Sequence, residues 1–155
     1  MAQLKRLTHH DVQFRSELER LAELSAKAQD LKFPITNLEK FSTSSDRIYV
    51  ITNRGRLEGY LRIGTRDLWL TNPINNVYKQ FPSVISVLDF FVEHQRSGNG
   101  PRLFDFAIEL ENVFPHMIAY DRPSDKMKSF LARRDLILIE QSNKYFVSLK
   151  FFFPS

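Results

Sequence analysis

A buried strand, a glycine-containing turn and a helix follow one another in the second half of this chain, and this succession restricts what the chain can fold into. The apolar run Val84–Val92 predicts the strand, Gln95–Gly100 forms the turn, and a helical pattern begins at Pro101. Such a turn points backbone N–H groups at one spot, where the N-terminus of the helix adds partial positive charge. The segment therefore predicts a binding site for a phosphate or a pyrophosphate.

The turn has the sequence Gln-Arg-Ser-Gly-Asn-Gly, which differs from two common phosphate-binding patterns. It lacks the Lys-Ser/Thr ending of a nucleotide P-loop and the three glycines of a dinucleotide fingerprint. In isolation, Gly98 and Gly100 would be interpreted as an ordinary turn before a helix. The flanking strand and helix, together with the Asp-Arg-Pro-Ser stretch at Asp121–Ser124, favour the phosphate site instead.

Composition excludes several classes of protein and of site. The 155 residues are 43% hydrophobic and 26% charged, which predicts one soluble globular domain over residues 1–155. The absence of cysteine excludes disulfides, thiolate metal sites and a cysteine nucleophile, and no spacing of His, Asp or Glu indicates a metal. No run is long enough to span a membrane. The net charge of +4 favours anionic partners, but no dense Lys/Arg stripe indicates nucleic acid.

The spacing of apolar residues predicts the order of helices and strands. Helices are expected over residues 10–29 and 101–111 and after Ser124, whose side chain is a candidate N-cap. Residues 72–83 are expected to form a loop. Together the elements predict an α/β layered domain with a mixed sheet. The expected strands cover residues 47–52, 57–64, 68–70, 84–92, 117–120, 136–140 and 145–152.

Several stretches, in order from about residue 25 to residue 133, resemble the alpha-tubulin N-acetyltransferase family of the GNAT acetyltransferases. The turn is similar to the GNAT pyrophosphate loop. Ser25–Gln29 with Pro34–Thr36 resembles the end of the family's first helix and the loop after it, and Val87–Val92 resembles its central strand. Ile118–Ser124, followed by Lys126 and Phe130-Leu131, resembles its strand, catalytic turn and second cofactor helix.

The resemblance implies the GNAT fold, in which helices flank a mixed, mostly antiparallel sheet, with Leu4–Leu7 as a remnant of the first strand. It implies a lysine N-acetyltransferase that moves the acetyl group of acetyl-CoA to an alpha-tubulin lysine facing the microtubule lumen, without a metal. Catalysis is assigned to Asp121. The residues expected to bind acetyl-CoA are Phe91, Val92, Gln95, Arg96, Ser97, Gly98, Asn99, Gly100, Ser124, Lys126 and Arg133.

The same resemblance implies partners and a location. Alpha-tubulin and microtubules are the expected partners, and neither nucleic acid nor a membrane is expected. The chain is expected to act as a monomer in the cytoplasm on the cytoskeleton, the cilium or flagellum included.

The chain departs from the family's pattern at three positions. Ser86 stands where animal members have a cysteine, and a serine has little acid–base capacity near neutral pH. Ser42 stands in place of a glutamine, and Pro101 removes one N–H from the phosphate site. Two alternatives therefore stay open: a GNAT enzyme with another amine substrate, and a GNAT-like domain that binds microtubules with weak or no catalysis.

The two aspartates near the expected site have different interpretations. From the residues alone, Asp121 is equally a catalytic group or a cap for the following helix. A model aspartate has a pKa of about 3.9 and a lysine about 10.4, so direct proton transfer is uphill by roughly 9 kcal/mol. Asp121 can assist only if burial raises its pKa or if it orients an amine that loses its proton through water. Asp89 lies inside an apolar strand and is expected to be structural and hydrogen-bonded, and a backbone N–H near residues 89–91 is expected to meet the oxyanion, as in GNAT folds generally.

Overall fold

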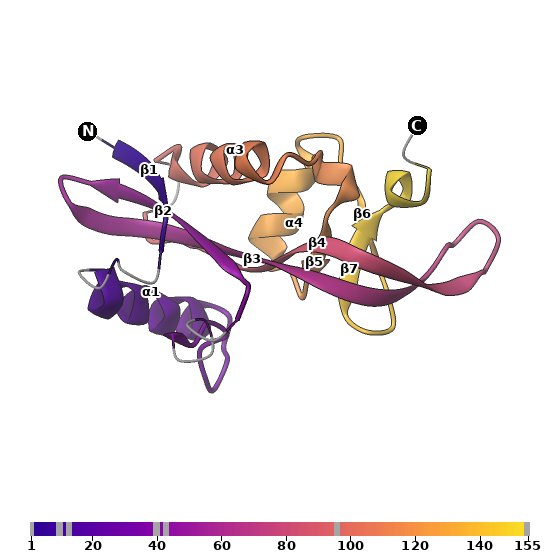
Figure 1. Ribbon diagram of the computed structural model, residues 1–155, viewed down its shortest axis with the longest axis horizontal. Coiled ribbons are helices and arrows are strands. Elements are labelled where there is room, and N and C mark those ends of the chain that lie inside the picture. Colours follow the sequence, from indigo (N-terminus) through magenta and orange to yellow (C-terminus); the bar gives the residue numbers. More distant parts are fainter. Residues whose placement is uncertain are drawn as a thin grey trace. The chain divides into compact units, whose positions relative to one another are not determined.

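The computed structural model describes residues 2–8, 11, 14–38, 41, 44–94 and 97–153, and none of the helices in these ranges is long and apolar enough to cross a membrane. Figure 1 shows the elements. The strands are β1 Ala2–Arg6, β2 Arg47–Asn53, β3 Arg56–Thr71, β4 Tyr78–Val92, β5 Ala119–Asp121, β6 Leu138–Glu140 and β7 Tyr145–Ser148. The helices are α1 Arg15–Ala28, α3 Asn99–Glu111 and α4 Asp125–Ala132, with the 3-10 turns η2 Pro115–Met117 and η3 Leu149–Phe152.

Hydrogen bonds join the strands in the order β1-β2-β3-β4-β5-β7-β6. The pair β4–β5 is parallel, and the pairs β1–β2, β2–β3, β5–β7 and β6–β7 are antiparallel. The predicted mixed, mostly antiparallel sheet is therefore confirmed. The chain forms two compact units, the first from residues 1–63 and 89–111 and the second from residues 64–88 and 112–155.

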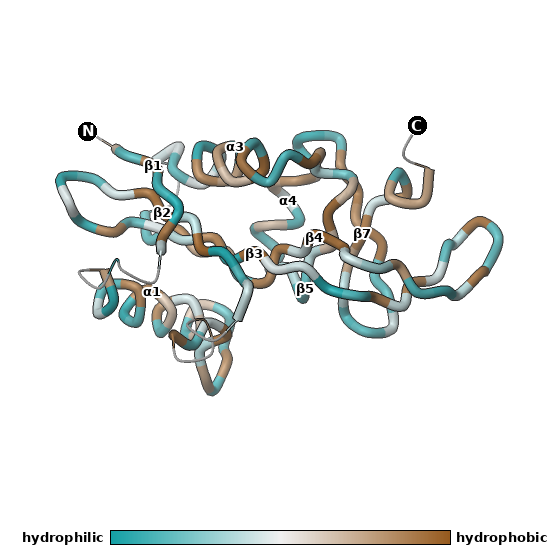
Figure 2. Tube along the Cα trace, in the orientation of Figure 1, coloured by the Kyte–Doolittle hydropathy of each residue, from teal (hydrophilic) through white to brown (hydrophobic). Residues whose placement is uncertain are grey.

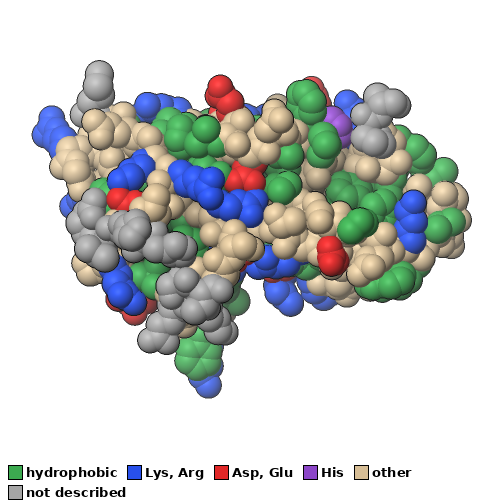
Figure 3. All heavy atoms as spheres, in the orientation of Figure 1, with side chains coloured by type: hydrophobic (Ala, Val, Ile, Leu, Met, Phe, Trp, Pro, Cys, Tyr) green, Lys and Arg blue, Asp and Glu red, His purple; other side chains and the backbone are tan. Residues whose placement is uncertain are grey.

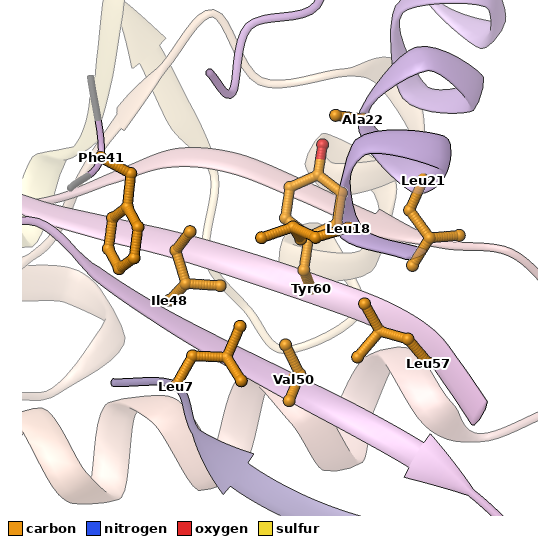
Figure 4. Packing of buried hydrophobic residues seen from close by; sticks show 9 residues of the cluster. All are labelled: Leu7, Leu18, Leu21, Ala22, Phe41, Ile48, Val50, Leu57 and Tyr60. Atoms are coloured by element: carbon orange, nitrogen blue, oxygen red, sulfur yellow. The ribbon is translucent and has the colours of Figure 1, made fainter. Parts of the chain in front are cut away.

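The core of the first unit packs α1 against one side of β2 and β3. Strand β2 alternates: Ile48 and Val50 join the cluster under α1, whereas Tyr49 between them meets Phe106 of α3 edge-on, with ring centroids 6.1 Å apart. Within this unit, α1 and α3 lie on opposite sides of these strands (Figure 1). The cluster under α1 (Figure 4) contains Leu7, Leu18, Leu21, Ala22, Phe41, Ile48, Val50, Leu57 and Tyr60.

Helix α3 is amphipathic and tied at its end. Hydrophobic and hydrophilic stretches alternate along it (Figure 2), and Leu103, Phe104 and Ala107 form its buried side. Its last residue, Glu111, accepts hydrogen bonds from Arg47 at 3.0 and 2.5 Å and from the hydroxyl of Tyr49. These contacts fix the axis of α3 and so the direction of its N-terminus.

The second unit has a separate, aromatic-rich core. Phe81 of β4 contacts the rings of Phe151 and Phe152 edge-on, with centroids 5.3 and 5.7 Å apart. Such pairs add about 0.5–1.5 kcal/mol each beyond the burial of their area. Three of the 14 phenylalanines of the chain pack together in this core. The buried residues of this core are Leu68, Leu70, Val84, Ala119 and Val147.

The predicted loop over residues 72–83 is wrong, and so is the predicted break between residues 64 and 68. Strand β3 runs without interruption to Thr71, and β4 already begins at Tyr78. The asparagines serve a short turn, in which Asn72 and Asn75 accept the N–H groups of Ile74 and Val77. The pattern did not indicate a strand because residues 78–83 are mostly exposed and include Pro82. Ser83, just after the proline, takes a positive φ of 53°.

The remaining boundaries shift by a few residues. Helix α1 begins at Arg15 rather than at residue 10, and the last strand ends at Ser148, where a 3-10 turn replaces its predicted continuation. The strand predicted at residues 117–120 lies at Ala119–Asp121. The first strand is confirmed at Ala2–Arg6, and the short turn between β2 and β3 has positive φ angles at Arg54 and Gly55.

Candidate active site

The end of β4 supplies backbone rather than side chains to the candidate cofactor site. The side chains of Phe91 and Val92 pack inward: Val92 is buried, and Phe91 packs on the core with its ring 6.5 Å from that of Tyr60. Gly59 of β3 lies against this segment, and a Cβ atom added there would come within 3.0 Å of the Phe91 carbonyl oxygen. A side chain at position 59 would therefore displace this strand segment, a constraint that the sequence analysis missed.

The turn between β4 and α3 has the backbone conformation that its glycine allows. Gly98 takes a φ of +80° in open space, a conformation that strains other residues. Ser97 Oγ donates to the His94 carbonyl at 2.7 Å and accepts the Asn99 N–H at 3.4 Å. The first N–H groups of a helix have no acceptor within it, so the start of α3 at Asn99 is suited to an anion. The predicted site residues Gln95 and Arg96, like Ser42, lie outside the described residues.

Glu58 of β3 braces this turn and was missed by sequence reasoning. Its carboxylate accepts the Asn99 side-chain amide at 3.3 Å and lies 3.9 Å from Nε2 of His94. Its carbonyl oxygen accepts the Glu93 N–H at 2.9 Å. The buried side chain of Asn99 is thus engaged within the protein.

A second brace joins the start of the turn to α1. Arg20 donates to both carboxylate oxygens of Glu93, at 2.8 and 3.2 Å. These hydrogen bonds hold the pKa of Glu93 below its ordinary value. The turn is therefore anchored on both sides by charged groups from other elements of the first unit.

Asp89 lies in β4, three residues before its end at Val92, and only 5% of its surface is exposed. Its Oδ2 accepts the hydroxyls of Thr36 at 2.6 Å and Tyr60 at 2.5 Å. Burial raises the pKa of Asp89, an effect that the two hydroxyls and the charge of Arg62 oppose. The prediction that a buried Asp89 needs hydrogen-bond partners is confirmed.

In the second unit, Asp121 is the last residue of β5 and pairs with Tyr145 of β7. Its side chain is 18% exposed, and Arg122 Nη1 lies 3.3 Å from its Oδ1. Arg122 takes a positive φ of 42° and donates its N–H to the Lys144 carbonyl, so the chain turns sharply after Asp121. The carboxylate therefore lies at a strand end, where functional groups often emerge.

Helix α4 is capped by Ser124, and the alternative interpretation of Asp121 as the cap is wrong. Ser124 Oγ accepts the Met127 N–H at 3.1 Å, and this hydrogen bond caps the N-terminus of the helix. Lys126 and Arg133 are both exposed. Seven residues of helix separate them by about 10 Å, so they are suited to different parts of an extended ligand rather than to one phosphate.

Ser86 shares a face of the β4–β5 pair with Asp121. Ser86 pairs with Ala119 in parallel register, and residues two apart along a strand point to the same side. The buried Ser86 hydroxyl donates to the Val84 carbonyl at 3.1 Å. The Ser86 hydroxyl proton is therefore engaged in a hydrogen bond within the strand.

One family model and several curated proteins match this chain. The model described as GNAT acetyltransferase, Mec-17, matches residues 2–155. The chain is 34% identical to the alpha-tubulin N-acetyltransferase of Tetrahymena thermophila, covering 87% of this chain and 34% of the relative. It is 36% identical to alpha-tubulin N-acetyltransferase 1 of Danio rerio (87% and 48%) and 31% identical to the alpha-tubulin N-acetyltransferase of Plasmodium vivax (88% and 74%). The chain thus spans about a third to a half of the length of the first two.

Solved structures with the same fold are more distant in sequence. An aminoglycoside acetyltransferase from an uncultured soil metagenomic sample, in complex with sisomicin, is 18% identical with a TM-score of 0.56, covering 86% of this chain and 84% of its own. A mutant AtaT toxin, bound to the C-terminus of the antitoxin AtaR and acetyl-CoA, is 12% identical with a TM-score of 0.55 and covers 99% of both chains. Since the family model matches nearly the whole sequence, this chain belongs to the Mec-17 family of GNAT acetyltransferases.

Proposed function

We propose that residues 1–155 form a single acetyl-CoA-dependent N-acetyltransferase domain that modifies a lysine of alpha-tubulin, the one facing the microtubule lumen. Membership in the Mec-17 family and three relatives named alpha-tubulin N-acetyltransferase support the reaction and the substrate. The observation that carries the cofactor assignment is the turn between β4 and α3, where Gly98 and the start of α3 together suit a pyrophosphate.

Acetyl-CoA is expected to contact the two stretches predicted from the sequence. In the first, the backbone of Phe91, Val92 and the turn 95–100 would hold the pantetheine and pyrophosphate, and Arg96 would add charge. In the second, the exposed Lys126 and Arg133 would meet the 3′-phosphate and adenosine end, with Ser124 at the helix start. No metal takes part in the proposed reaction.

The proposed chemistry is direct transfer. The lysine ε-nitrogen attacks the thioester carbonyl, the C–N bond forms, and the C–S bond breaks with the thiolate of CoA as leaving group. The attacking amine must lose a proton, and we assign Asp121 to orient the amine while that proton leaves through water. A backbone N–H of β4 near residues 89–91 would stabilise the oxyanion.

The proposed partner is alpha-tubulin within microtubules. The chain is proposed to act on it as a monomer, in the cytoplasm and in cilia or flagella. The net charge of +4 suits an acidic partner surface. Figure 3 shows Lys and Arg side chains at several separate places on the face drawn, rather than in one stripe. Neither nucleic acid nor a membrane is part of the proposal.

The test uses purified protein, acetyl-CoA and polymerised tubulin, with acetyl-lysine on alpha-tubulin as the readout. Asp121→Asn is expected to abolish the signal. Asp125→Asn is the matched control, because this aspartate on α4 is exposed and forms a surface ion pair with Lys128 at 3.7 Å. A signal that survives in Asp121→Asn would remove Asp121 from the mechanism.

Two observations keep a second function in view, a GNAT-like domain that binds microtubules with weak or no catalysis. The Ser86 hydroxyl is committed to the Val84 carbonyl, and Pro101 lacks an N–H in the first turn of α3. Calorimetry separates the two, because an absence of heat with acetyl-CoA would favour the binding domain. Competition between a lysine peptide library and microtubules would identify a transferase with another amine substrate.

A further inference from the structure

The carboxylate of Asp89 joins three elements of the first unit through one oxygen atom. Oδ2 accepts the hydroxyl of Tyr60 on β3 and the hydroxyl of Thr36, which follows α1. The other oxygen, Oδ1, is buried and has no hydrogen-bond partner among the residues that the structure describes. The two hydrogen bonds are similar in length, but they attach very different parts of the chain.

Thr36 belongs to loop 31–37, which is otherwise largely exposed. Leu31 is 42% and Phe33 72% exposed, whereas Thr36 is only 4% exposed. Next to Thr36, the Ile35 carbonyl accepts a hydrogen bond from Arg62 at 3.3 Å. The loop is thus attached to the strands at two adjacent residues, and its apolar tip projects beyond the attachment.

Tyr60 differs from Thr36 because its position does not depend on its hydroxyl. It pairs with Val50 in the β2–β3 ladder, and its ring is fully buried in the core under α1. Removal of the Tyr60 hydroxyl therefore leaves the residue in place. Removal of the Thr36 hydroxyl takes away an attachment of the loop to β4.

We propose that Thr36 and Asp89 are positioning residues for acetyl transfer, because their hydrogen bond fastens loop 31–37 to the strand segment that holds the acetyl donor. This inference rests on the proposed function and deepens it. The loop presents Leu31 and Phe33 to the protein that carries the acceptor lysine, and the Thr36–Asp89 hydrogen bond fixes that surface relative to residues 89–92. Neither residue touches the reacting atoms.

The kinetic test compares two variants that each lose one hydroxyl donated to the same oxygen. Thr36→Val is expected to lower kcat/KM for polymerised tubulin about fivefold, the equivalent of one net hydrogen bond, with the affinity for acetyl-CoA unchanged within about twofold. Tyr60→Phe is expected to stay within about twofold of wild type in both measurements. Equal effects of the two variants on kcat/KM, or none in Thr36→Val, would overturn the proposal.

The conservative variant Asp89→Asn separates position from charge. Its amide oxygen can accept both hydroxyls, and its NH2 group takes the place of the unpartnered oxygen. Activity is expected to stay within about fivefold of wild type, whereas Asp89→Leu loses far more. If Asp89→Asn were as inactive as Asp89→Leu at equal folded fraction, Asp89 would act through its charge and the positioning role would be wrong.

Proteolysis gives a readout that does not require activity. Lys32 is exposed in loop 31–37, so a lysine-specific protease reports how often the loop detaches. Cleavage after Lys32 is expected to be several-fold faster in Thr36→Val than in wild type, and unchanged in Tyr60→Phe. If the wild-type protein transferred no acetyl group, the proposed function would fail, while this cleavage rate would still decide whether the hydrogen bond holds the loop.

Discussion

Two aspartates, one in each unit, show how the same side chain is used in opposite ways. Asp89 is 5% exposed and accepts two neutral hydroxyls, so its surroundings hold it without a directly bonded positive partner. Asp121 ends a strand, is 18% exposed and has the guanidinium of Arg122 3.3 Å away. A buried carboxylate that accepts neutral hydroxyls, like that of Asp89, joins parts of the fold. A partly exposed carboxylate at a strand end beside a cation, like that of Asp121, is suited to contact with substrate.

The largest expected effect comes from exchanging each carboxylate for an amide. Asp121→Asn is expected to reduce kcat by about 10²–10⁴, the usual contribution of general acid–base catalysis. Asp89→Asn is expected to change it by less than about fivefold, as a positioning residue whose acceptor oxygen is kept. Steady-state acetylation of microtubules measures both. Equal losses of kcat in the two variants would show that Asp121 and Asp89 do not differ in role.

The next effect concerns the stability of the fold. Asp89→Leu leaves the buried hydroxyls of Thr36 and Tyr60 without their acceptor and is expected to lower the free energy of unfolding by about 2–4 kcal/mol. Asp121→Leu is expected to cost less than about 1 kcal/mol, since the pair with Arg122 is partly exposed. Urea unfolding at neutral pH gives both values, and the reverse ranking would contradict the assignment.

A smaller effect depends on pH. Burial raises the pKa of Asp89 above its ordinary 3.8, so the native state binds this proton more tightly than the unfolded state. Its stabilising contribution is therefore present below about pH 3.8 and is lost as the pH rises through the folded pKa. Asp89→Asn lacks this loss, so its stability relative to wild type should increase between pH 3 and pH 8. A difference that stays constant with pH would show that Asp89 does not titrate abnormally.

The smallest effect concerns the helix after Asp121. Ser124→Ala removes the cap of α4 and is expected to lower the free energy of unfolding by about 1 kcal/mol. Asp121→Ala should leave the helix start intact, because Asp121 lies in the strand. Amide hydrogen exchange at Met127 distinguishes them. Faster exchange in Asp121→Ala than in Ser124→Ala would restore the capping interpretation of Asp121.

Much of the fold was predictable because its strongest patterns are local. The strand, the glycine turn and the helix around Gly98 depend on neighbouring residues, as do the cap at Ser124 and the hairpin turn at Arg54-Gly55. The sequence pattern failed where exposure and Pro82 disguised the first part of β4. Periodicity detects a strand by its buried face, and residues 78–83 are mostly exposed.

Local patterns in the sequence were enough to recognise the family, the order of elements, and the residue types that a phosphate turn and a strand-end carboxylate need. The partners that hold these residues became visible in the folded protein. Glu58 braces Asn99 from 41 residues away, and Asp89 binds Thr36 across 53 residues. Gly59 is favoured because the Phe91 carbonyl oxygen and the Val92 side chain lie 3.0 and 3.1 Å from where a Cβ atom would stand. Contacts so distant along the chain follow no periodicity, because strand pairing and helix packing bring them together only when the core forms.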